Sequence, residues 1–225
     1  MNTPRPLSHF HLVTRTETYV RAQMGADPTG HDWWHAARVR DLAVRIALAE
    51  GIAGESLELV EITALLHDLE DEKFSGSATA GPEAARTFCL EAGCLAEFAA
   101  QVADIIAAMS YAGALVADVP MTLAGQCVRD ADRLDAMGAI GIARAFAYGG
   151  HFDRPIHNPD LAPNLAESKA SYRATKGATI NHFYEKLLLL RDRMDTATGR
   201  QIADSRHKVM VDFLTRFDAE WHGQD

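Results

Sequence analysis

His67 and Asp68 stand side by side at the end of an apolar run, Ala64-Leu65-Leu66. An imidazole and a carboxylate seldom end a run that reads as a buried helix unless something pairs with them. His35 lies upstream and Asp132 lies downstream, each in a segment with helical apolar spacing. These two histidines and two aspartates form a candidate ligand set for one divalent metal ion, held by three different helices.

Two imidazoles and two carboxylates suit Mn²⁺, Fe²⁺, Ni²⁺, Co²⁺ or Mg²⁺ in an octahedral arrangement with two open positions. Open positions admit water or phosphate oxygens, so such a site can lower the pKa of a bound water and neutralise charge on a phosphoryl group. A single buried histidine is more often a core residue than a ligand. The combination of four such residues favours the metal site.

The elements that must position these residues are helices, because apolar residues recur with helical spacing and strand-like alternation is weak throughout. Pro and Gly residues cluster over residues 148–163 and predict an extended loop. No linker or repeat divides the chain, so we expect one all-α domain. The expected helices cover residues 36–50, 56–69, from Pro82 to about 93, 95–109, from about 120 to 137, 165–195 and 198–221.

The composition is that of a globular protein, with 225 residues, 48% hydrophobic and 24% charged. No uninterrupted apolar run is long enough for a membrane span, and no secretory signal begins the sequence. Cys89, Cys94 and Cys127 form no CxxC pair and read as reduced thiols, so we expect a soluble cytoplasmic protein. A net charge of −9 disfavours coating of nucleic acid but allows a small phosphate-bearing substrate.

The four candidate ligands and their flanking segments resemble the signature of the HD-domain superfamily of metal-dependent phosphohydrolases. Within it, the chain is similar to the bacterial subfamily that includes nucleotide pyrophosphohydrolases. The resemblance implies an HD-type helical bundle with long C-terminal helices over residues 1–225, with a core at about 30–150 and a C-terminal helical part at about 164–222. The segments that carry it are Gly30-His31-Asp32-Trp33-Trp34-His35, Ala64-Leu65-Leu66-His67-Asp68, residues 130–144, His182-Phe183-Tyr184-Glu185-Lys186-Leu187, Arg206-His207 and Glu220-Trp221.

No histidine lies between His67 and His151. Di-iron oxygenases and cyclic-dinucleotide phosphodiesterases of the superfamily use additional histidine ligands in that interval. The gap therefore favours one metal ion and hydrolysis over oxygen chemistry. Among the candidate ions, we expect manganese.

Asp71 and Glu72 are the candidates for a general base on a water molecule. If the helix continues, they lie three and four residues after Asp68, on the same face. They loosely resemble the acidic pair that follows the HD dipeptide in guanosine tetraphosphate hydrolases. A solvated, charged helix end is an equally good interpretation of this pair.

Four cationic residues are candidates for substrate contacts. Lys73 and Arg133 adjoin the candidate catalytic and ligand residues, Arg144 lies about three helical turns later, and Lys186 belongs to the C-terminal segment of the resemblance. The alternative for the two arginines is a structural salt bridge, with Asp135 or a glutamate as its partner. For Lys73, a surface role is the alternative.

Two residues precede His35 by four and three positions. His31 and Asp32 are interpreted either as groups that orient this ligand or, for Asp32, as the N-cap of the helix. Elsewhere, Met109 and Ala112 stand where many relatives carry a polar residue, which leaves substrate preference open.

The sequence therefore predicts a divalent-metal-dependent phosphohydrolase acting on a nucleotide or related small phosphate ester. The resemblance suggests cleavage of a nucleoside triphosphate to a monophosphate and pyrophosphate. A nucleotide phosphomonoesterase and a non-catalytic nucleotide-sensing HD module stay open as alternatives. No nucleic-acid coating and no membrane partner are expected, and a homodimer is left open.

Overall fold

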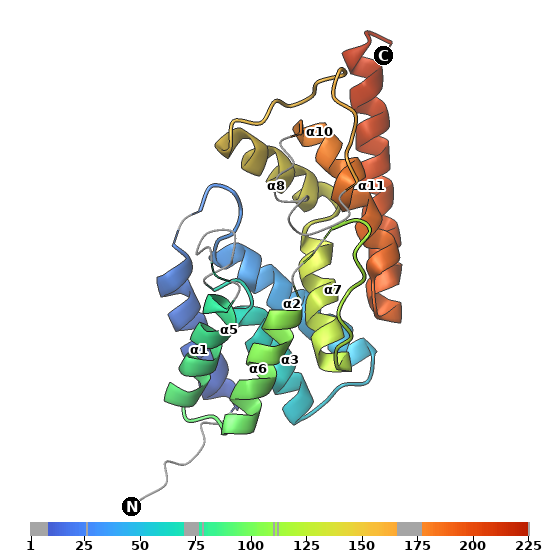
Figure 1. Ribbon diagram of the computed structural model, residues 1–225. Helices are drawn as coiled ribbons and strands as arrows, with labels where there is room; N and C mark the ends of the chain where they lie inside the picture. Colours follow the sequence, from blue (N-terminus) through green and yellow to red (C-terminus); the bar gives the residue numbers. More distant parts are fainter. Residues whose placement is uncertain are drawn as a thin grey trace, which may run out of the picture. The chain divides into compact units, whose positions relative to one another are not determined.

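The computed structural model describes residues 9–25, 27–69, 77, 79–109, 111, 113–165 and 177–224. Within these ranges the chain forms helices and turns and no strand, which confirms the all-α prediction (Figure 1). The helices are α1 (His9–Met24), α2 (Trp33–Ala49), α3 (Glu55–Leu66), α5 (Ala80–Glu91), α6 (Ala96–Ala108), α7 (Leu123–Asp135), α8 (Gly138–His151), α10 (Thr179–His182), a π-helical turn η1 (Phe183–Leu187), a 3-10 turn η2 (Leu188–Arg193) and α11 (Ala197–Trp221).

The chain divides into two compact units. The first comprises residues 1–27, 31–110 and 119–131, and the second comprises residues 28–30, 111–118 and 132–225. The boundary after Ala131 lies inside α7 rather than in the loop that separates the two parts expected from the sequence. The prediction of a single HD-type domain over residues 1–225 stays a prediction.

In the first unit, α3 lies at the centre and packs against α1, α2 and α6. Val60, Ile62, Leu65 and Leu66 are fully buried, as expected for a helix that is apolar on every side. The amphipathic helix α2 buries one face and leaves its arginines largely on the other. His67 and Asp68 directly follow this central helix, so the core of the unit determines where they lie.

In the second unit, α11 packs against α8 and η2. An aromatic cluster joins these elements, because Phe146 of α8, Phe183 of η1 and Phe213 of α11 lie with ring centroids 5.8 to 6.1 Å apart. Phe183 is fully buried. This cluster is the apolar centre around which the C-terminal helices pack.

The expected helix boundaries agree with the structure to within a few residues for α2, α3, α5, α6 and α11. The fifth predicted helix, from about 120 to 137, agrees equally well with α7. A separate helix, α8, follows from Gly138, whose φ of 69° suits glycine and interrupts the helical path. The sequence analysis assigned no element to α1 or to the first ten residues of α8.

The predicted loop over residues 148–163 is wrong for its first four residues, which form the last turn of α8. Gly149 is a contact residue rather than a helix breaker. A Cβ at this position would lie 2.2 Å from Thr179 Oγ1, so only glycine allows α10 to approach this closely.

The long helix predicted over residues 165–195 is helical over residues 179–193 of its described part, but it is not one regular α-helix. Residues 179–193 form the short α10, η1 and η2 in succession, and Met194 has extended backbone. The first two amides of α10 are bonded by the preceding loop, since the Thr179 and Ile180 N–H groups donate to Pro155 O and Ile156 O at 2.8 and 3.0 Å. These hydrogen bonds satisfy amides at the start of α10, so the helix begins at Thr179.

Candidate metal centre

The side chain of His35 is held inside the first unit by the start of α2. Asp32 is the N-cap, and its Oδ1 accepts a hydrogen bond from the His35 backbone N–H at 3.0 Å. This confirms the capping interpretation of Asp32. His35 is 1% exposed, so its imidazole is removed from water and depends on protein groups or a ligand for polar partners.

His67 is the C-cap residue of α3, and its ring orientation is set by the helix itself. Its Nδ1 lies 2.8 Å from Ala64 O. A carbonyl oxygen only accepts, so Nδ1 carries the hydrogen and Nε2 presents a lone pair. That Nε2 lies 3.2 Å from Nε2 of His35, with the two ring centroids 5.1 Å apart. The two imidazoles therefore direct their Nε2 atoms toward a common point.

Asp68 completes the cluster within the first unit. Its Oδ2 lies 2.9 Å from His31 Nδ1 and 3.6 Å from His35 Nε2. Burial opposes ionisation of this carboxyl, but the hydrogen bond from His31 and the nearby His67 and His35 outweigh it. They hold the pKa of Asp68 well below its usual range, so the group is a carboxylate at neutral pH.

These groups fit a divalent metal ion. Ligand atoms of His31, His35 and Asp68 all lie within 4.8 Å of one another, and His67 Nε2 adjoins them. Imidazole nitrogen and carboxylate oxygen are suitable ligand atoms for borderline divalent ions. His67 is in the tautomer that leaves a lone pair on Nε2, as metal binding through that atom requires. The chemistry that such a donor set supports is activation of water and binding of phosphate oxygens.

The fourth predicted ligand, Asp132, lies on α7 one residue after the boundary between the units. Asp132 lies four residues, about one helical turn, after Val128, and Val128 is fully buried in the first unit. The role of Asp132 as a ligand stays a prediction.

Several other predicted residues lie outside the described part of the chain. These are the general-base candidates Asp71 and Glu72, the phosphate candidate Lys73, and Ala112. Met109, the other position that departs from the family pattern, is the C-cap of α6.

The two predicted substrate arginines lie in the second unit, and each forms an ion pair there. Arg144 Nη1 lies 2.9 Å from Asp135 Oδ2, the partner named in the structural alternative. Arg133 pairs instead with Asp118, at 2.6 Å, and donates to Arg193 O at 2.5 Å. Their role as substrate contacts stays a prediction alongside these pairs.

Lys186 lies on η1, with Nζ 5.0 Å from the centroid of the Tyr111 ring. This distance is within the range of a cation–π interaction. The structure thus gives Lys186 an aromatic neighbour that the spacing of the sequence did not indicate, and its predicted contact with substrate is untested.

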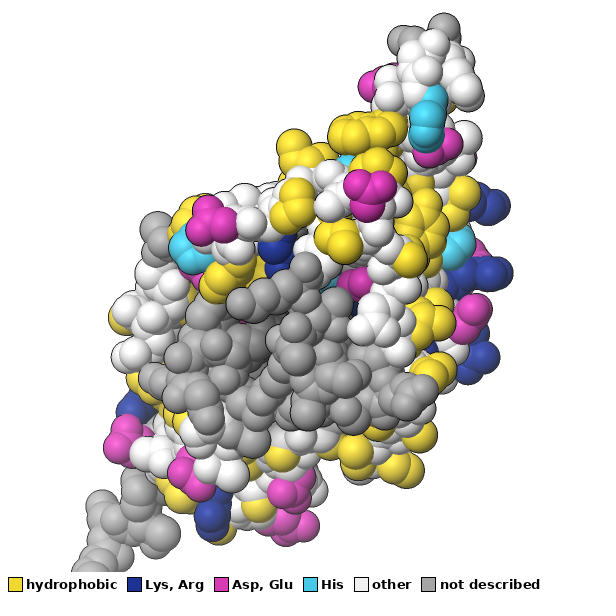
Figure 2. Space-filling model, turned by 45° about the horizontal axis from the view of Figure 1, so that its top comes forward, with side chains coloured by type: hydrophobic (Ala, Val, Ile, Leu, Met, Phe, Trp, Pro, Cys, Tyr) yellow, Lys and Arg dark blue, Asp and Glu magenta, His cyan; other side chains and the backbone are white. Residues whose placement is uncertain are grey.

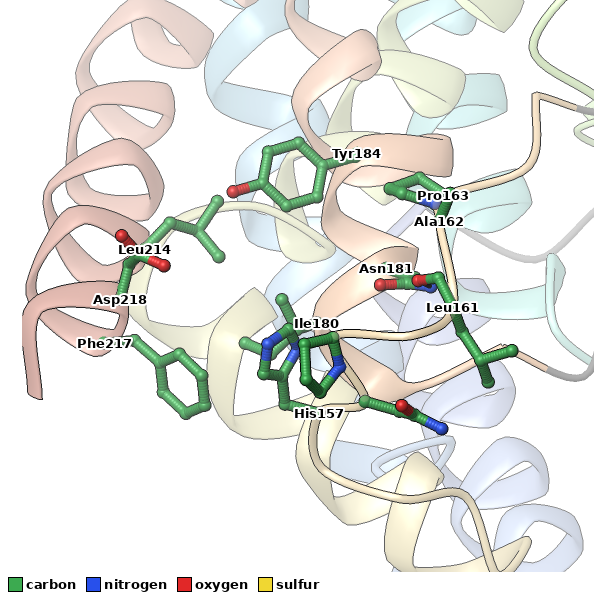
Figure 3. A pocket seen from close by; sticks show the side chains of 12 residues that line it. His157, Leu161, Ala162, Pro163, Ile180, Asn181, Tyr184, Leu214, Phe217 and Asp218 are labelled. Atoms are coloured by element: carbon green, nitrogen blue, oxygen red, sulfur yellow. Dashed lines mark hydrogen bonds between the residues drawn. The ribbon is translucent and has the colours of Figure 1, made fainter. Parts of the chain in front are cut away.

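The second unit also contains a pocket of about 190 Å³, and none of the predicted site residues that the structure describes lines it (Figure 3). Its walls come from the loop after α8, from α10 and η1, and from α11. Tyr184, Asn181, His157, Phe217 and Asp218 are among its lining residues. It is mostly apolar, and it lies in a different unit from the histidine cluster.

Among the described residues that Figure 2 shows, acidic, basic and hydrophobic side chains are interspersed. None of the helices within the described residues combines the length and apolar character needed to cross a membrane.

Comparison with known proteins places these residues in a family. The family model described as HD domain matches residues 33–137, a range that contains all four predicted ligands. The Bacillus subtilis protein YpgQ is 34% identical over 220 residues, covering 97% of this chain and 98% of that protein. The chain belongs to the HD-domain superfamily. YpgQ extends the similarity through the C-terminal helices, beyond the matched HD range.

Several solved structures are similar to this chain in sequence and in fold. A Lactobacillus plantarum protein has a TM-score of 0.83 at 36% identity, covering 95% of this chain and 98% of that chain. An HD-superfamily hydrolase from Bacillus thuringiensis has a TM-score of 0.73 at 36% identity, covering 96% and 100%. YpgQ in complex with ADP has a TM-score of 0.74 at 32% identity, covering 95% and 97%.

Proposed function

We propose that this HD protein is a divalent-metal-dependent phosphohydrolase that acts on a nucleotide. The observation that carries the proposal is the convergence of His35 Nε2 and His67 Nε2, 3.2 Å apart, beside the Asp68 carboxylate. His35 and His67 present imidazole nitrogen and Asp68 presents carboxylate oxygen to one ion, with Asp132 as the fourth ligand. A bound divalent ion would supply a water of lowered pKa and neutralise charge on the phosphoryl group.

The chain's own residues then divide the remaining work. Asp71 or Glu72 would take the proton from the attacking water. Lys73, Arg133, Arg144 and Lys186 are the proposed phosphate contacts, because cationic side chains stabilise phosphate oxygens. For the two arginines, this role requires them to exchange the carboxylates that they now hold for phosphate.

The ADP complex of YpgQ supports a nucleotide substrate, because the similarity to YpgQ extends over almost the whole of this chain. We favour cleavage of a nucleoside triphosphate to a monophosphate and pyrophosphate, with one manganese ion per chain. A phosphomonoesterase and a nucleotide-sensing module without turnover are the alternatives. The ADP complex by itself is compatible with either of them.

The test is a panel of nucleoside mono-, di- and triphosphates with added Mn²⁺, Mg²⁺ or Co²⁺, scored separately for pyrophosphate and orthophosphate. Metal content of the purified protein is measured in parallel. Pyrophosphate release from triphosphates supports the favoured reaction, and orthophosphate release from monophosphates supports the phosphomonoesterase. Tight nucleotide binding without either product supports the sensing module and contradicts the proposed hydrolysis.

The matched variants are His67→Ala and His222→Ala. His222 is an exposed histidine at the end of α11, so its loss controls for removal of an imidazole as such. We expect His67→Ala to lose metal and turnover together, and His222→Ala to keep both.

A further inference from the structure

We infer that His31 is a positioning residue that orients Asp68 for the metal ion, although His31 lies outside the four-residue ligand set. The inference rests on the proposed function, since it assigns Asp68 to that ion. The observation behind it is the contact of 2.9 Å between His31 Nδ1 and Asp68 Oδ2, formed across 37 residues of sequence.

The contact has a defined direction. Asp68 is a carboxylate, which only accepts, so the hydrogen lies on His31 Nδ1 and that nitrogen is a donor. A nitrogen that carries a hydrogen has no lone pair for a metal ion. The ring atom of His31 that touches Asp68 therefore acts on the carboxylate and does not bind a metal itself.

Burial makes this contact able to hold Asp68 in one orientation. The side chains of His31 and Asp68 are 15% and 9% exposed, so water competes little for either partner. The ring of His31 also packs edge-to-face on His35, with centroids 5.8 Å apart and an interplanar angle of 74°. Because Asp32, the next residue, caps α2, the start of that helix fixes the backbone of His31.

The consequence is a restricted Asp68 side chain. The oxygen that accepts from His31, Oδ2, also lies 3.6 Å from His35 Nε2, so the hydrogen bond from His31 limits rotation of the carboxylate and keeps it beside the ligand atom of His35. Metal-binding histidines are usually oriented by a carboxylate or a carbonyl. Here the relation is reversed, because a histidine orients the ligating carboxylate while a carbonyl, Ala64 O, orients His67.

The test uses three variants at one position. His31→Asn places an amide N–H close to where Nδ1 lies, His31→Gln reaches closer to the place of Nε2, and His31→Leu removes both nitrogens. Binding of Mn²⁺ is measured by electron paramagnetic resonance of the free ion, and binding of Co²⁺ by its visible absorption. Circular dichroism and thermal unfolding of each variant establish that it is folded.

We expect His31→Leu to weaken metal binding by about 10- to 100-fold, the range found when a group that orients a ligand is removed. His31→Asn should restore most of this affinity, and His31→Gln should restore less. If His31→Leu binds both ions as tightly as the wild type, the inference is overturned. If Gln restores binding and Asn does not, His31 acts through Nε2 as a ligand, and the positioning role is overturned.

Failure of the proposed function gives a different result. Wild-type protein that binds metal and hydrolyses none of the nucleotides contradicts the hydrolase, while the order Asn, Gln, Leu in metal affinity still supports the role of His31. Wild-type protein that binds neither ion contradicts both. If His31→Leu does not fold, the comparison of Asn with Gln decides the matter.

Discussion

Nδ1 of His67 lies 2.8 Å from the backbone carbonyl oxygen of Ala64, three residues earlier in the chain. This single contact selects the tautomer of the imidazole before any ligand arrives, because the carbonyl accepts the hydrogen on Nδ1. It uses the last turn of α3, where carbonyl groups lack partners within the helix. The carbonyl of Ala64 thus gains a hydrogen-bond donor, and the same hydrogen bond fixes the direction in which His67 Nε2 points.

Removing this imidazole should remove the metal. In His67→Ala we expect metal content to fall from about one ion per chain to a small fraction, because one ligand and its orientation are lost together. Elemental analysis of dialysed protein measures this, with His222→Ala as the control. Wild-type turnover in His67→Ala would show that the assignment of the site is wrong.

Arg144 provides a test that separates structure from substrate binding. Its partner Asp135 has a side chain that is only 4% exposed, so Arg144→Met removes a charged hydrogen-bond donor from a buried carboxylate. We expect a loss of about 1.5–3 kcal/mol in the free energy of unfolding, measured in urea. The double variant Arg144→Met/Asp135→Leu should recover much of it.

The same variants bear on the predicted phosphate contact. If Arg144 only stabilises the fold, the folded fraction of Arg144→Met should have an unchanged KM. A contact with phosphate predicts a raised KM that the double variant does not recover. An unfolding free energy equal to that of the wild type would contradict the structural pair.

Two neighbouring glycines of α8 should respond in opposite directions to the same substitution. A Cβ on Gly149 would lie 2.2 Å from Thr179 Oγ1, so Gly149→Ala should cost about 1–3 kcal/mol of stability. A Cβ on Gly150 meets nothing within 4 Å, and Gly150→Ala should stabilise the helix by about 0.5–1 kcal/mol. Thermal and urea unfolding of both variants check this, and equal effects would refute the close approach of α10.

The three thiols should differ in reactivity. The hydrogen bond from Cys89 lowers the pKa of Cys94 below its ordinary value of 9.0, whereas the same contact and burial raise the pKa of Cys89. Burial raises the pKa of Cys127 to about 12. As the pH rises, Cys94 is therefore the first to become a thiolate, which is the reactive form.

Iodoacetamide at pH 7 to 8 should label Cys94 before the other two, and peptide mapping by mass spectrometry measures the order. The labelling rate of Cys94 should rise with pH with a midpoint below the ordinary thiol pKa of 9.0. Cys127 should be labelled at an appreciable rate only after unfolding. Equal rates for the three thiols in the folded protein would contradict this.

Much of the fold could be predicted from local pattern. The apolar spacing of α2, α3 and α6 predicted amphipathic or buried helices, because a helix gains stability by burying a continuous face. The same spacing identified His67 and Asp68 as polar groups at the end of a buried segment. The N-cap role of Asp32 could also be predicted, because it depends only on a backbone N–H three residues later in the chain.

The errors share one cause, which is that a residue acts on a partner far away in the chain. The Gly149-Gly150 pair predicted a loop, and the structure uses Gly149 for a close contact with Thr179 inside a helix. Residues 165–195 predicted one long helix, and in the described part of that segment the helix begins at Thr179, where the first amides donate to the carbonyl oxygens of Pro155 and Ile156. Local propensity cannot register either contact.

The sequence alone determined the helical class, the resemblance to HD proteins and the types of residue that could hold a metal, because these depend on composition, spacing and side-chain chemistry. Only the tertiary structure decided which groups meet. It paired Arg144 with Asp135 and Arg133 with Asp118, and it placed His31 on Asp68 across 37 residues. The reason is physical: hydrogen bonds and ion pairs depend on distances of about 3 Å, and packing of the helices sets those distances.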